Sequence, residues 1–315
     1  MTTPIATNAH STEPLIAIML CTHNGSQFLT EQLASITAQT FRNWRLIVSD
    51  DGSTDATHDI LLDGTIDSSR IEIRSGPQIG VSKNYMSLLT DDRIEADYFA
   101  YCDQDDIWAP NKLQRAIDQL RLVPADRPAL YFSRVRLITA NGEHLGYTRR
   151  CKRPPSFENA LVENIASGNT IVINKGARQL LVRAGDVEVA MHDWWSYLLI
   201  TGAGGVLCYD EVPSILYRQH QANTIGVDRG IRAVAKRFQR LWSQSFAEKT
   251  AMNAAALQRC RHLLRAENRF ILDLFVALRS SSVVLRLLSL RRARIYRQTV
   301  MDQASLIFAV AMKLV

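Results

Sequence analysis

Residues 98–108 read Tyr98-Phe99-Ala100-Tyr101-Cys102-Asp103-Gln104-Asp105-Asp106-Ile107-Trp108, an apolar run followed by three carboxylates within four positions. The apolar run predicts a buried strand, and the acids follow directly where that strand ends. Carboxylates so close together repel one another unless a positive charge lies between them. Mg²⁺ or Mn²⁺ binds one or two carboxylates together with phosphate oxygens. Asp103 and Asp105 therefore predict metal-assisted binding of a diphosphate, with an acidic loop that caps the next helix as the alternative.

Three more predicted strands precede this one, and stretches of helical periodicity separate them. The predicted strands are 15–21, 44–48 and 71–74. Continuous apolar runs are typical of strands buried on both faces of a parallel sheet. The βαβαβαβ order predicts an α/β fold with a doubly wound, mostly parallel sheet.

Polar residues follow each of these strands. They are Thr22 to Asn24, Asp50 to Asp55, Lys83 and Asp103 to Asp106. Open α/β sheets bind their ligands at the carboxyl ends of the strands, so we expect one shared crevice. The alternative is that these are turn residues without a common function. The sequence has neither a Walker A motif nor G-x-G-x-x-G after the first strand, which argues against a P-loop and the usual dinucleotide fold.

In these motifs the chain resembles the inverting nucleotide-sugar glycosyltransferases of family 2, which have the GT-A fold. Within that family it is most similar to bacterial rhamnosyltransferases of surface-polysaccharide assembly. The resemblance covers roughly residues 14–226, with the motifs in the family order. The motifs are Cys21-Thr22-His23-Asn24-Gly25, Ser49-Asp50-Asp51-Gly52-Ser53-Thr54-Asp55, Gly80-Val81-Ser82-Lys83-Asn84-Tyr85, Asp103-Gln104-Asp105-Asp106-Ile107-Trp108, Ser167-Gly168-Asn169-Thr170, His192-Asp193-Trp194-Trp195 and Tyr217-Arg218-Gln219-His220.

The resemblance implies a role for each motif. Asp193 would be the general base that deprotonates the acceptor hydroxyl, which then attacks the anomeric carbon in line. Donor-binding residues would be Thr22, Asn24, Asp50, Asp51, Lys83, Asp103 and Arg218. Acceptor-side residues would be Ser167, Gly168, Asn169, Trp194 and Trp195. Asp103, Asp105 and His220 would hold Mg²⁺ or Mn²⁺.

Simpler roles remain open for several of these residues. Asp193 could cap the helix that follows it, and the two tryptophans could be core packing. His220 could contact the diphosphate, or it could be an ordinary loop histidine. The family often has Glu before the catalytic Asp, whereas this chain has His192, which matches the rhamnosyltransferase-like subset. The Q-x-x-R-W motif of processive synthases is absent from the sequence, so we do not expect synthesis of long chains.

Charge divides the sequence into two parts. Residues 1–228 contain 20 basic and 27 acidic residues, a net charge of −7, whereas residues 229–315 contain 17 and 4, a net charge of +13. We therefore expect a disordered N-terminus over 1–13, a GT-A catalytic domain over 14–228 and a basic amphipathic helical extension over 229–315. The boundary lies near Val227 to Gly230.

Apolar stripes alternate with basic residues in the C-terminal extension. They fall in 231–242, 270–278, 283–290 and 304–315. None approaches the roughly 18–20 uninterrupted apolar residues of a spanning helix. Basic amphipathic helices favour an anionic membrane surface, and a helical subdomain or dimer contact is the alternative. No nucleic-acid-binding motif accompanies the basic charge, so we do not expect a nucleic-acid partner.

The N-terminus lacks the apolar core of a secretory signal, and the five cysteines are scattered. Both features predict a cytoplasmic protein, and the basic helices predict that it is peripheral on the inner face of the cytoplasmic membrane. The expected enzyme moves one sugar, rhamnose from dTDP-rhamnose by resemblance, to a glycan or lipid-linked saccharide acceptor in surface-polysaccharide synthesis. One alternative is a nucleotidyltransferase, although Thr22 to Gly25 is not its Gly-rich basic loop. Another is a non-catalytic membrane scaffold with a degenerate transferase domain.

Overall fold

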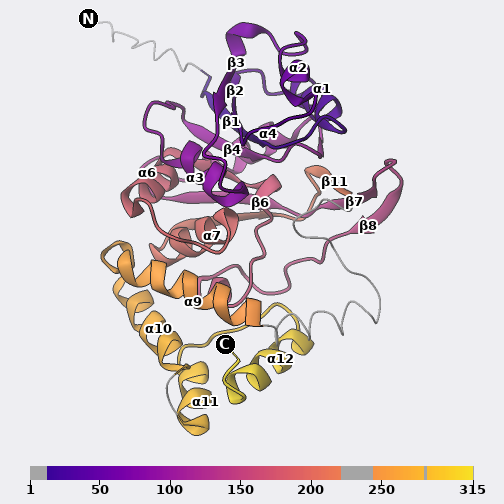
Figure 1. Ribbon diagram of the computed structural model, residues 1–315. Coiled ribbons are helices and arrows are strands. Elements are labelled where there is room, and N and C mark those ends of the chain that lie inside the picture. The colour runs from indigo at the N-terminus through magenta and orange to yellow at the C-terminus, as the bar shows by residue number, and fades with distance from the viewer. Residues whose placement is uncertain (1–12, 221–243, 280–281, 315) are drawn as a thin grey trace, which may run out of the picture.

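The computed structural model describes residues 13–220, 244–279 and 282–314 (Figure 1). The predicted disordered segment lies outside the described residues except for Glu13. The proposed boundary near Val227 to Gly230 and the apolar stripe 231–242 lie outside them as well. The three-part division of the chain therefore stays a prediction.

A seven-stranded sheet forms the centre of the described part, in the order β10-β6-β9-β4-β1-β2-β3. Its strands are β1 (Ile16–Thr22), β2 (Trp44–Asp50), β3 (Ile71–Ser75), β4 (Tyr98–Cys102), β6 (Ala129–Ser133), β9 (Val172–Asn174) and β10 (Val206–Asp210). The first four are parallel neighbours, and β10 is parallel to β6. Only β9 runs antiparallel, between β4 and β6. The predicted mostly parallel sheet is confirmed.

Helices cover both faces of this sheet because successive residues of a strand point to opposite sides. Ile16, Ile18 and Leu20 pack in the same cluster as the apolar residues of α1 and α4. Ala17 and Met19 pack on the other face, in the cluster of α3, α6 and α7. The helices of this part are α1 (Leu29–Thr37), α2 (Thr57–Leu61), α3 (Val81–Thr90), α4 (Lys112–Leu120), α5 (Phe157–Ala160), α6 (Lys175–Ala184) and α7 (His192–Gly202), with short 3-10 turns at Ser68–Arg70 and Gly168–Thr170.

A smaller four-stranded sheet, which the sequence analysis did not anticipate, stands beside the large one. Its order is β5-β11-β7-β8, from β5 (Ile107–Trp108), β11 (Ile215–Gln219), β7 (Arg136–Thr139) and β8 (His144–Tyr147). β5 directly follows the acids of residues 103–106, and β11 pairs with it antiparallel. This pairing carries the end of β11 back to the carboxyl end of β4.

The predicted C-terminal helices are confirmed, and they lie below α7 in Figure 1. They are α9 (Gln244–Arg259), α10 (Ala266–Ala277), α11 (Val283–Arg292) and α12 (Val300–Ala311), with a 3-10 turn at Arg261–Leu263. Their buried residues, among them Leu257, Phe275 and Leu306, share one apolar cluster with α7. Over 13–220, 244–279 and 282–314, no helix combines the length and the apolar character needed to cross a bilayer.

Candidate active site

The ends of β1 and β2 hold a fixed carboxylate. Parallel register sets Thr22 beside Asp50, and the Thr22 hydroxyl donates to Asp50 Oδ1 at 2.7 Å. The backbone N–H of Ser53 donates to Asp50 Oδ2 at 2.9 Å. Burial opposes ionisation, but the hydrogen bonds from Ser53 and Thr22 hold the pKa of Asp50 below its ordinary value. The structure thus brings together two of the predicted donor-binding residues.

Asp51 organises the loop that leads into α3. Its Oδ1 accepts the backbone N–H of Gln78 at 2.6 Å, and its Oδ2 accepts that of Gly80 at 3.0 Å. Gly80, with a φ of 99°, is the residue before α3. Lys83 lies in the first turn of α3 and pairs with Asp186 at 2.7 Å. Asp51 therefore fixes the start of the helix that carries Lys83.

The turn Thr22–Gly25 after β1 is clamped to the loop after β4. Gln104 Oε1 accepts the His23 N–H at 2.9 Å, and Gln104 Nε2 donates to the His23 carbonyl at 3.0 Å. Asn24 Oδ1 accepts the N–H of Thr54 at 2.8 Å, which ties the same turn to the end of β2. A Cβ on Gly25 would overlap Gln104 Oε1 and stand 2.6 Å from its Cδ. Glycine at position 25 therefore permits this clamp, which sequence reasoning missed.

The acidic loop Asp103–Asp106 contains the predicted metal ligands. Tyr85 donates its hydroxyl hydrogen to Asp103 Oδ1 at 2.8 Å, and Asp105 Oδ2 lies 2.8 Å from His220 Nε2. Burial, together with the negative charge of Asp105, raises the pKa of Asp103 to about 7. The described residues contain no group of three or more His, Cys, Asp or Glu side chains arranged to hold a metal ion. Asp105 and His220 are in contact, as expected of two ligands of one metal ion. Asp103, the third predicted ligand, is instead hydrogen-bonded to Tyr85.

A buried lysine lies behind the acidic loop. Lys112 Nζ donates to the Asn169 carbonyl at 2.6 Å and stands 3.7 Å from the centre of the Trp108 ring. Asn169 Nδ2 in turn donates to Asp106 Oδ2 at 2.7 Å. Burial lowers the pKa of Lys112 to about 8, and burial with repulsion from Asp105 raises that of Asp106. This chain of contacts joins the acidic loop to Asn169, a predicted acceptor-side residue.

Asp193 lies in the first turn of α7 and is 6% exposed. Its Oδ2 accepts the backbone N–H of Gly168 at 3.2 Å, and its Oδ1 accepts that of Trp194 at 2.6 Å. Burial raises the pKa of Asp193 to about 6. A Cβ on Gly168 would stand 3.3 Å from the Asp193 Cβ, so glycine permits this close approach. Ser167 lies next to this contact and donates to Asn169 Oδ1 at 2.7 Å.

His192 and Tyr85 link Asp193 to the acidic loop. Their rings are stacked, with centroids 3.9 Å apart and 10° between the planes. Burial lowers the pKa of His192 to about 3, so the imidazole is neutral near pH 7. Tyr85 also donates to Asp103, so this stacked ring pair lies between Asp103 and the segment His192-Asp193, where the two residues are neighbours in the chain.

The two tryptophans after Asp193 pack inside the protein. Trp194 donates its ring N–H to the Ala160 carbonyl at 2.6 Å, and Trp195 is 0% exposed. Both rings belong to the apolar cluster of α7. Their assignment to the acceptor side stays a prediction that rests on the resemblance alone.

Arg218 is a predicted donor-binding residue, a candidate partner of the donor's phosphates, and its guanidinium makes several protein contacts. It pairs with Glu31 at 2.8 Å and donates to the carbonyls of Ala140 at 2.6 Å and Asp105 at 3.3 Å. Its side chain is only 2% exposed. These contacts hold the acidic loop in place from the side of α1 and β7, and direct phosphate contact stays a prediction.

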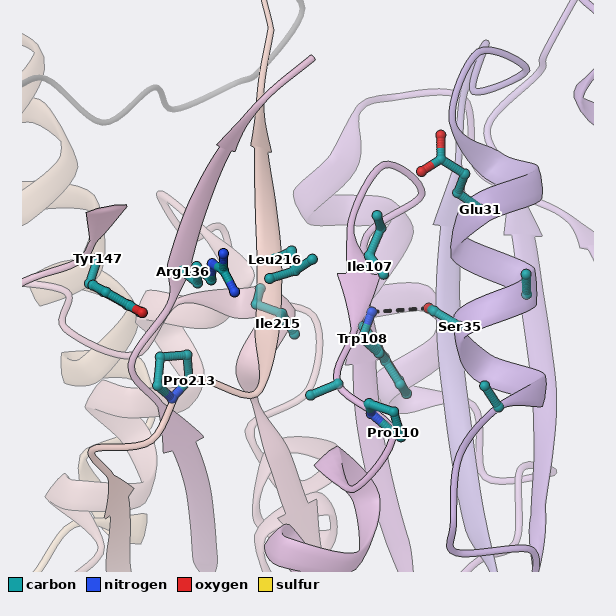
Figure 2. A pocket seen from close by; sticks show the side chains of 13 residues that line it. Glu31, Ser35, Ile107, Trp108, Pro110, Arg136, Tyr147, Pro213, Ile215 and Leu216 are labelled. Atoms are coloured by element: carbon teal, nitrogen blue, oxygen red, sulfur yellow. Dashed lines mark hydrogen bonds between the residues drawn. The ribbon is translucent and has the colours of Figure 1, made fainter. Parts of the chain in front are cut away.

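A groove of about 670 Å³ opens between α1, β5 and the small sheet, and Figure 2 shows its lining. Two of the lining residues are hydrogen-bonded, since the Trp108 N–H donates to Ser35 Oγ at 3.0 Å. Most lining residues are apolar, and Glu31 and Arg136 are its charged members. None of the predicted site residues lines it, although Glu31 pairs with Arg218. The groove therefore lies beside the predicted donor-binding residue Arg218, and its lining is mostly apolar.

The structure has a mostly parallel sheet with polar clusters at its carboxyl ends and a buried carboxylate at the start of α7, which agrees with the GT-A glycosyltransferase fold that the resemblance implies. The comparisons agree with this class. Residues 17–157 match the family described as Glycosyl transferase family 2. Residues 17–157 are thus similar to a family 2 domain, and the protein is a glycosyltransferase of the nucleotide-sugar-dependent type.

Individual relatives support the same assignment. The chain is 29% identical over 229 residues to "dTDP-rhamnosyl transferase RfbG" of Shigella flexneri, covering 69% of this chain and 77% of that protein. It is 26% identical over 168 residues to "Putative teichuronic acid biosynthesis glycosyltransferase TuaG" of Bacillus subtilis (strain 168), covering 52% of this chain and 63% of that protein. Among solved structures, that of S. aureus TarS residues 1–349 in complex with UDP-GlcNAc has a TM-score of 0.53 and 14% identity, covering 94% of this chain and 90% of that one. This last likeness concerns the fold alone.

Proposed function

We propose that the protein is an inverting transferase that moves a single rhamnose from dTDP-rhamnose to a lipid-linked saccharide during surface-polysaccharide synthesis. The observation that carries this proposal is Asp193, a buried carboxylate with a raised pKa, joined through His192 and Tyr85 to the acidic loop. The relative named as a dTDP-rhamnosyl transferase supports the donor. The relative named for teichuronic acid biosynthesis supports a surface polymer as the product.

The reaction follows from one base and one displacement. The Asp193 carboxylate takes the proton of the acceptor hydroxyl, and the hydroxyl oxygen forms a bond to the anomeric carbon. The bond from that carbon to the diphosphate oxygen breaks, and the nucleoside diphosphate leaves with its electron pair. A single displacement inverts the anomeric centre. A carboxylate with a pKa of about 6 is ionised at neutral pH yet more basic than an ordinary aspartate, which suits this role.

Other side chains prepare the site for the donor. Asp50 and Asp51 lie at the carboxyl end of β2, where the nucleoside of the donor would bind, with Thr22 and Asn24 on the neighbouring turn. Lys83 would face the diphosphate, and Arg218 would orient the acidic loop through the Asp105 carbonyl. These assignments extend the resemblance with the contacts described above.

The chemistry of the acidic loop fits a divalent cation. Two carboxylates within three residues, one against an imidazole, supply the oxygen-rich donor set that Mg²⁺ or Mn²⁺ prefers. Burial and then the negative charge of Asp105 raise the pKa of Asp103, and a bound cation would favour the ionised form of this carboxylate. Asp103, Asp105 and His220 would hold the ion, which when bound neutralises charge on the leaving diphosphate. Tyr85 orients the Asp103 carboxylate for this role.

Replacement of the base tests the proposal. We expect Asp193→Asn to lower the rate of rhamnosyl transfer roughly 10²–10⁴-fold, the usual contribution of a general base, without weakening donor binding. Asp118→Asn, a change to a half-exposed carboxylate on α4, is the matched control and should leave the rate unchanged. Equal transfer rates for both variants would refute the role of Asp193. Undiminished cellular function of the Asp193→Asn strain would favour a scaffold instead.

A further inference from the structure

The C-terminal helices expose an unusual amount of apolar surface. Seventeen large apolar side chains of the described residues are exposed, and nine of them lie between positions 283 and 312. These nine are Val283, Val284, Leu285, Leu288, Val300, Met301, Ile307, Phe308 and Met312. Single exposed apolar residues are normal, but a cluster of this kind marks an interaction surface. We call these nine residues the α11–α12 face.

Helical spacing gathers the exposed apolar residues of α12 on one side of that helix. On α12, Val300, Ala304, Phe308 and Met312 recur every four residues, and all four are exposed. The opposite side of α12 carries Leu306 and Val310, which are buried in the main apolar cluster. The exposed side therefore remains apolar although the helix already has a packed face.

Hydrogen bonds join the two helices. Arg286 of α11 donates to the carbonyls of Val310 at 2.8 Å and Ala311 at 2.7 Å, at the carboxyl end of α12. Arg286 and Leu290 are themselves buried, so α11 is held by both charge and packing. The α11–α12 face is thus a fixed surface of the folded protein.

Basic residues accompany the apolar ones. Residues 282–314 contain six Arg or Lys and a single acid, Asp302. That carboxylate is buried, and it accepts hydrogen bonds from Thr299 at 2.6 Å and from Arg149 at 3.1 Å. Four of the basic residues are exposed: Arg291, Arg292, Arg294 and Lys313. A partner of this surface must accept apolar side chains and carry negative charge.

We propose that the α11–α12 face docks on the surface of an anionic lipid bilayer, with its apolar side chains at the level of the acyl chains and its arginines at the headgroups. Such a surface meets both requirements, because interfacial binding combines apolar burial with attraction to anionic lipid. The inference deepens the proposed function, on which it rests, by naming the surface that would receive a lipid-linked acceptor. It narrows the membrane contact predicted for residues 229–315 to two helices.

A buried hydrogen-bond network connects this surface to the catalytic helix. Between α11 and α12, the Tyr296 carbonyl accepts from Asn159 Nδ2 at 3.1 Å, and the Gln298 N–H donates to Glu163 at 2.8 Å. Asn159 Oδ1 accepts the hydroxyl of Tyr197, a residue of α7, at 3.0 Å. Docking through α11 and α12 would therefore set the orientation of α7, the helix that carries Asp193, relative to the membrane surface.

Vesicle flotation of the full chain tests this surface. Vesicles of phosphatidylcholine with and without phosphatidylglycerol are compared for the wild type, Ile307→Glu/Phe308→Glu and Leu122→Glu. Leu122 is 80% exposed outside the face, so its variant is the matched control. We expect the wild type and the control to bind only the anionic vesicles, and the double variant to partition at least about tenfold more weakly. An Arg291→Glu/Arg292→Glu variant, which leaves the apolar residues unchanged, should lose vesicle binding to the same extent. This second variant still tests the inference if the first one fails to fold.

Two results would overturn the inference. Binding of both double variants as strong as that of the wild type would place the contact elsewhere. Absence of vesicle binding, with a wild-type dimer that Ile307→Glu/Phe308→Glu dissociates, would make the face a contact between two copies of the chain. Donor binding measured on the same samples separates this outcome from failure of the transferase proposal, because the variants lie outside the active site.

Discussion

Gly25 and Gln104 offer a sharp test of how the active site is assembled. Gly25→Ala places a Cβ where Gln104 Oε1 stands, so the glutamine must leave its two hydrogen bonds to His23. Each such bond contributes about 0.5–1.5 kcal/mol, and exposure to water favours the lower half of that range. We therefore expect Gly25→Ala to lower the free energy of unfolding by about 1–2 kcal/mol.

The double mutant makes this reasoning refutable. Gln104→Ala alone should lower the free energy of unfolding by about the same amount, because it removes the same two hydrogen bonds. In the Gln104→Ala background the obstacle is absent, so Gly25→Ala should become neutral or stabilise by up to about 1 kcal/mol through the less flexible unfolded chain. Urea unfolding of the four proteins measures the coupling. If Gly25→Ala lowers the free energy of unfolding equally in both backgrounds, the glycine is not needed to make room for Gln104.

Further predictions concern the base, the buried lysine and the metal. Burial raises the pKa of Asp193 to about 6, and the base must be ionised to act. We therefore expect kcat/KM to fall about tenfold per pH unit below pH 6. A pH profile that is flat down to about pH 4 would contradict the assignment of Asp193 as the base. Lys112→Met should lower the free energy of unfolding by about 3 kcal/mol, since it leaves the Asn169 carbonyl unpaired and removes the countercharge near Asp106, whereas Lys175→Met at an exposed position should cost little. Mn²⁺ binding followed by electron paramagnetic resonance should be weakened by Asp105→Asn and also by His220→Ala; equal affinity in all three proteins would remove these residues from the metal site.

The large sheet could be predicted because β1 and β4 are continuous apolar runs and β2 is largely apolar and buried. β3, which alternates apolar and charged residues and is only partly buried, was predicted from its place in the βα order. Ile16 to Thr22 is completely buried, and this is the pattern that distinguishes a central parallel strand. The meeting of Thr22 with Asp50 followed from the same topology, since parallel neighbours end at one edge.

The small sheet could not be predicted in the same way. β5 has only two residues, and its partner β11 lies more than a hundred positions further along the chain, so no local pattern marks the pair. The roles of Lys112 and Gln104 were missed for a related reason. Each looks like an ordinary polar residue of a helix or loop, and only tertiary packing buries the lysine and brings the glutamine to His23.

The measurement that tests the central claim most directly is turnover of a panel of nucleotide sugars by the full chain with Mg²⁺, Mn²⁺ or EDTA, alongside Asp105→Asn. The account predicts that dTDP-rhamnose is bound and consumed only with a metal ion, that the transferred sugar has the inverted anomeric configuration, and that Asp105→Asn loses this activity. Failure to bind any nucleotide sugar with either metal would contradict it.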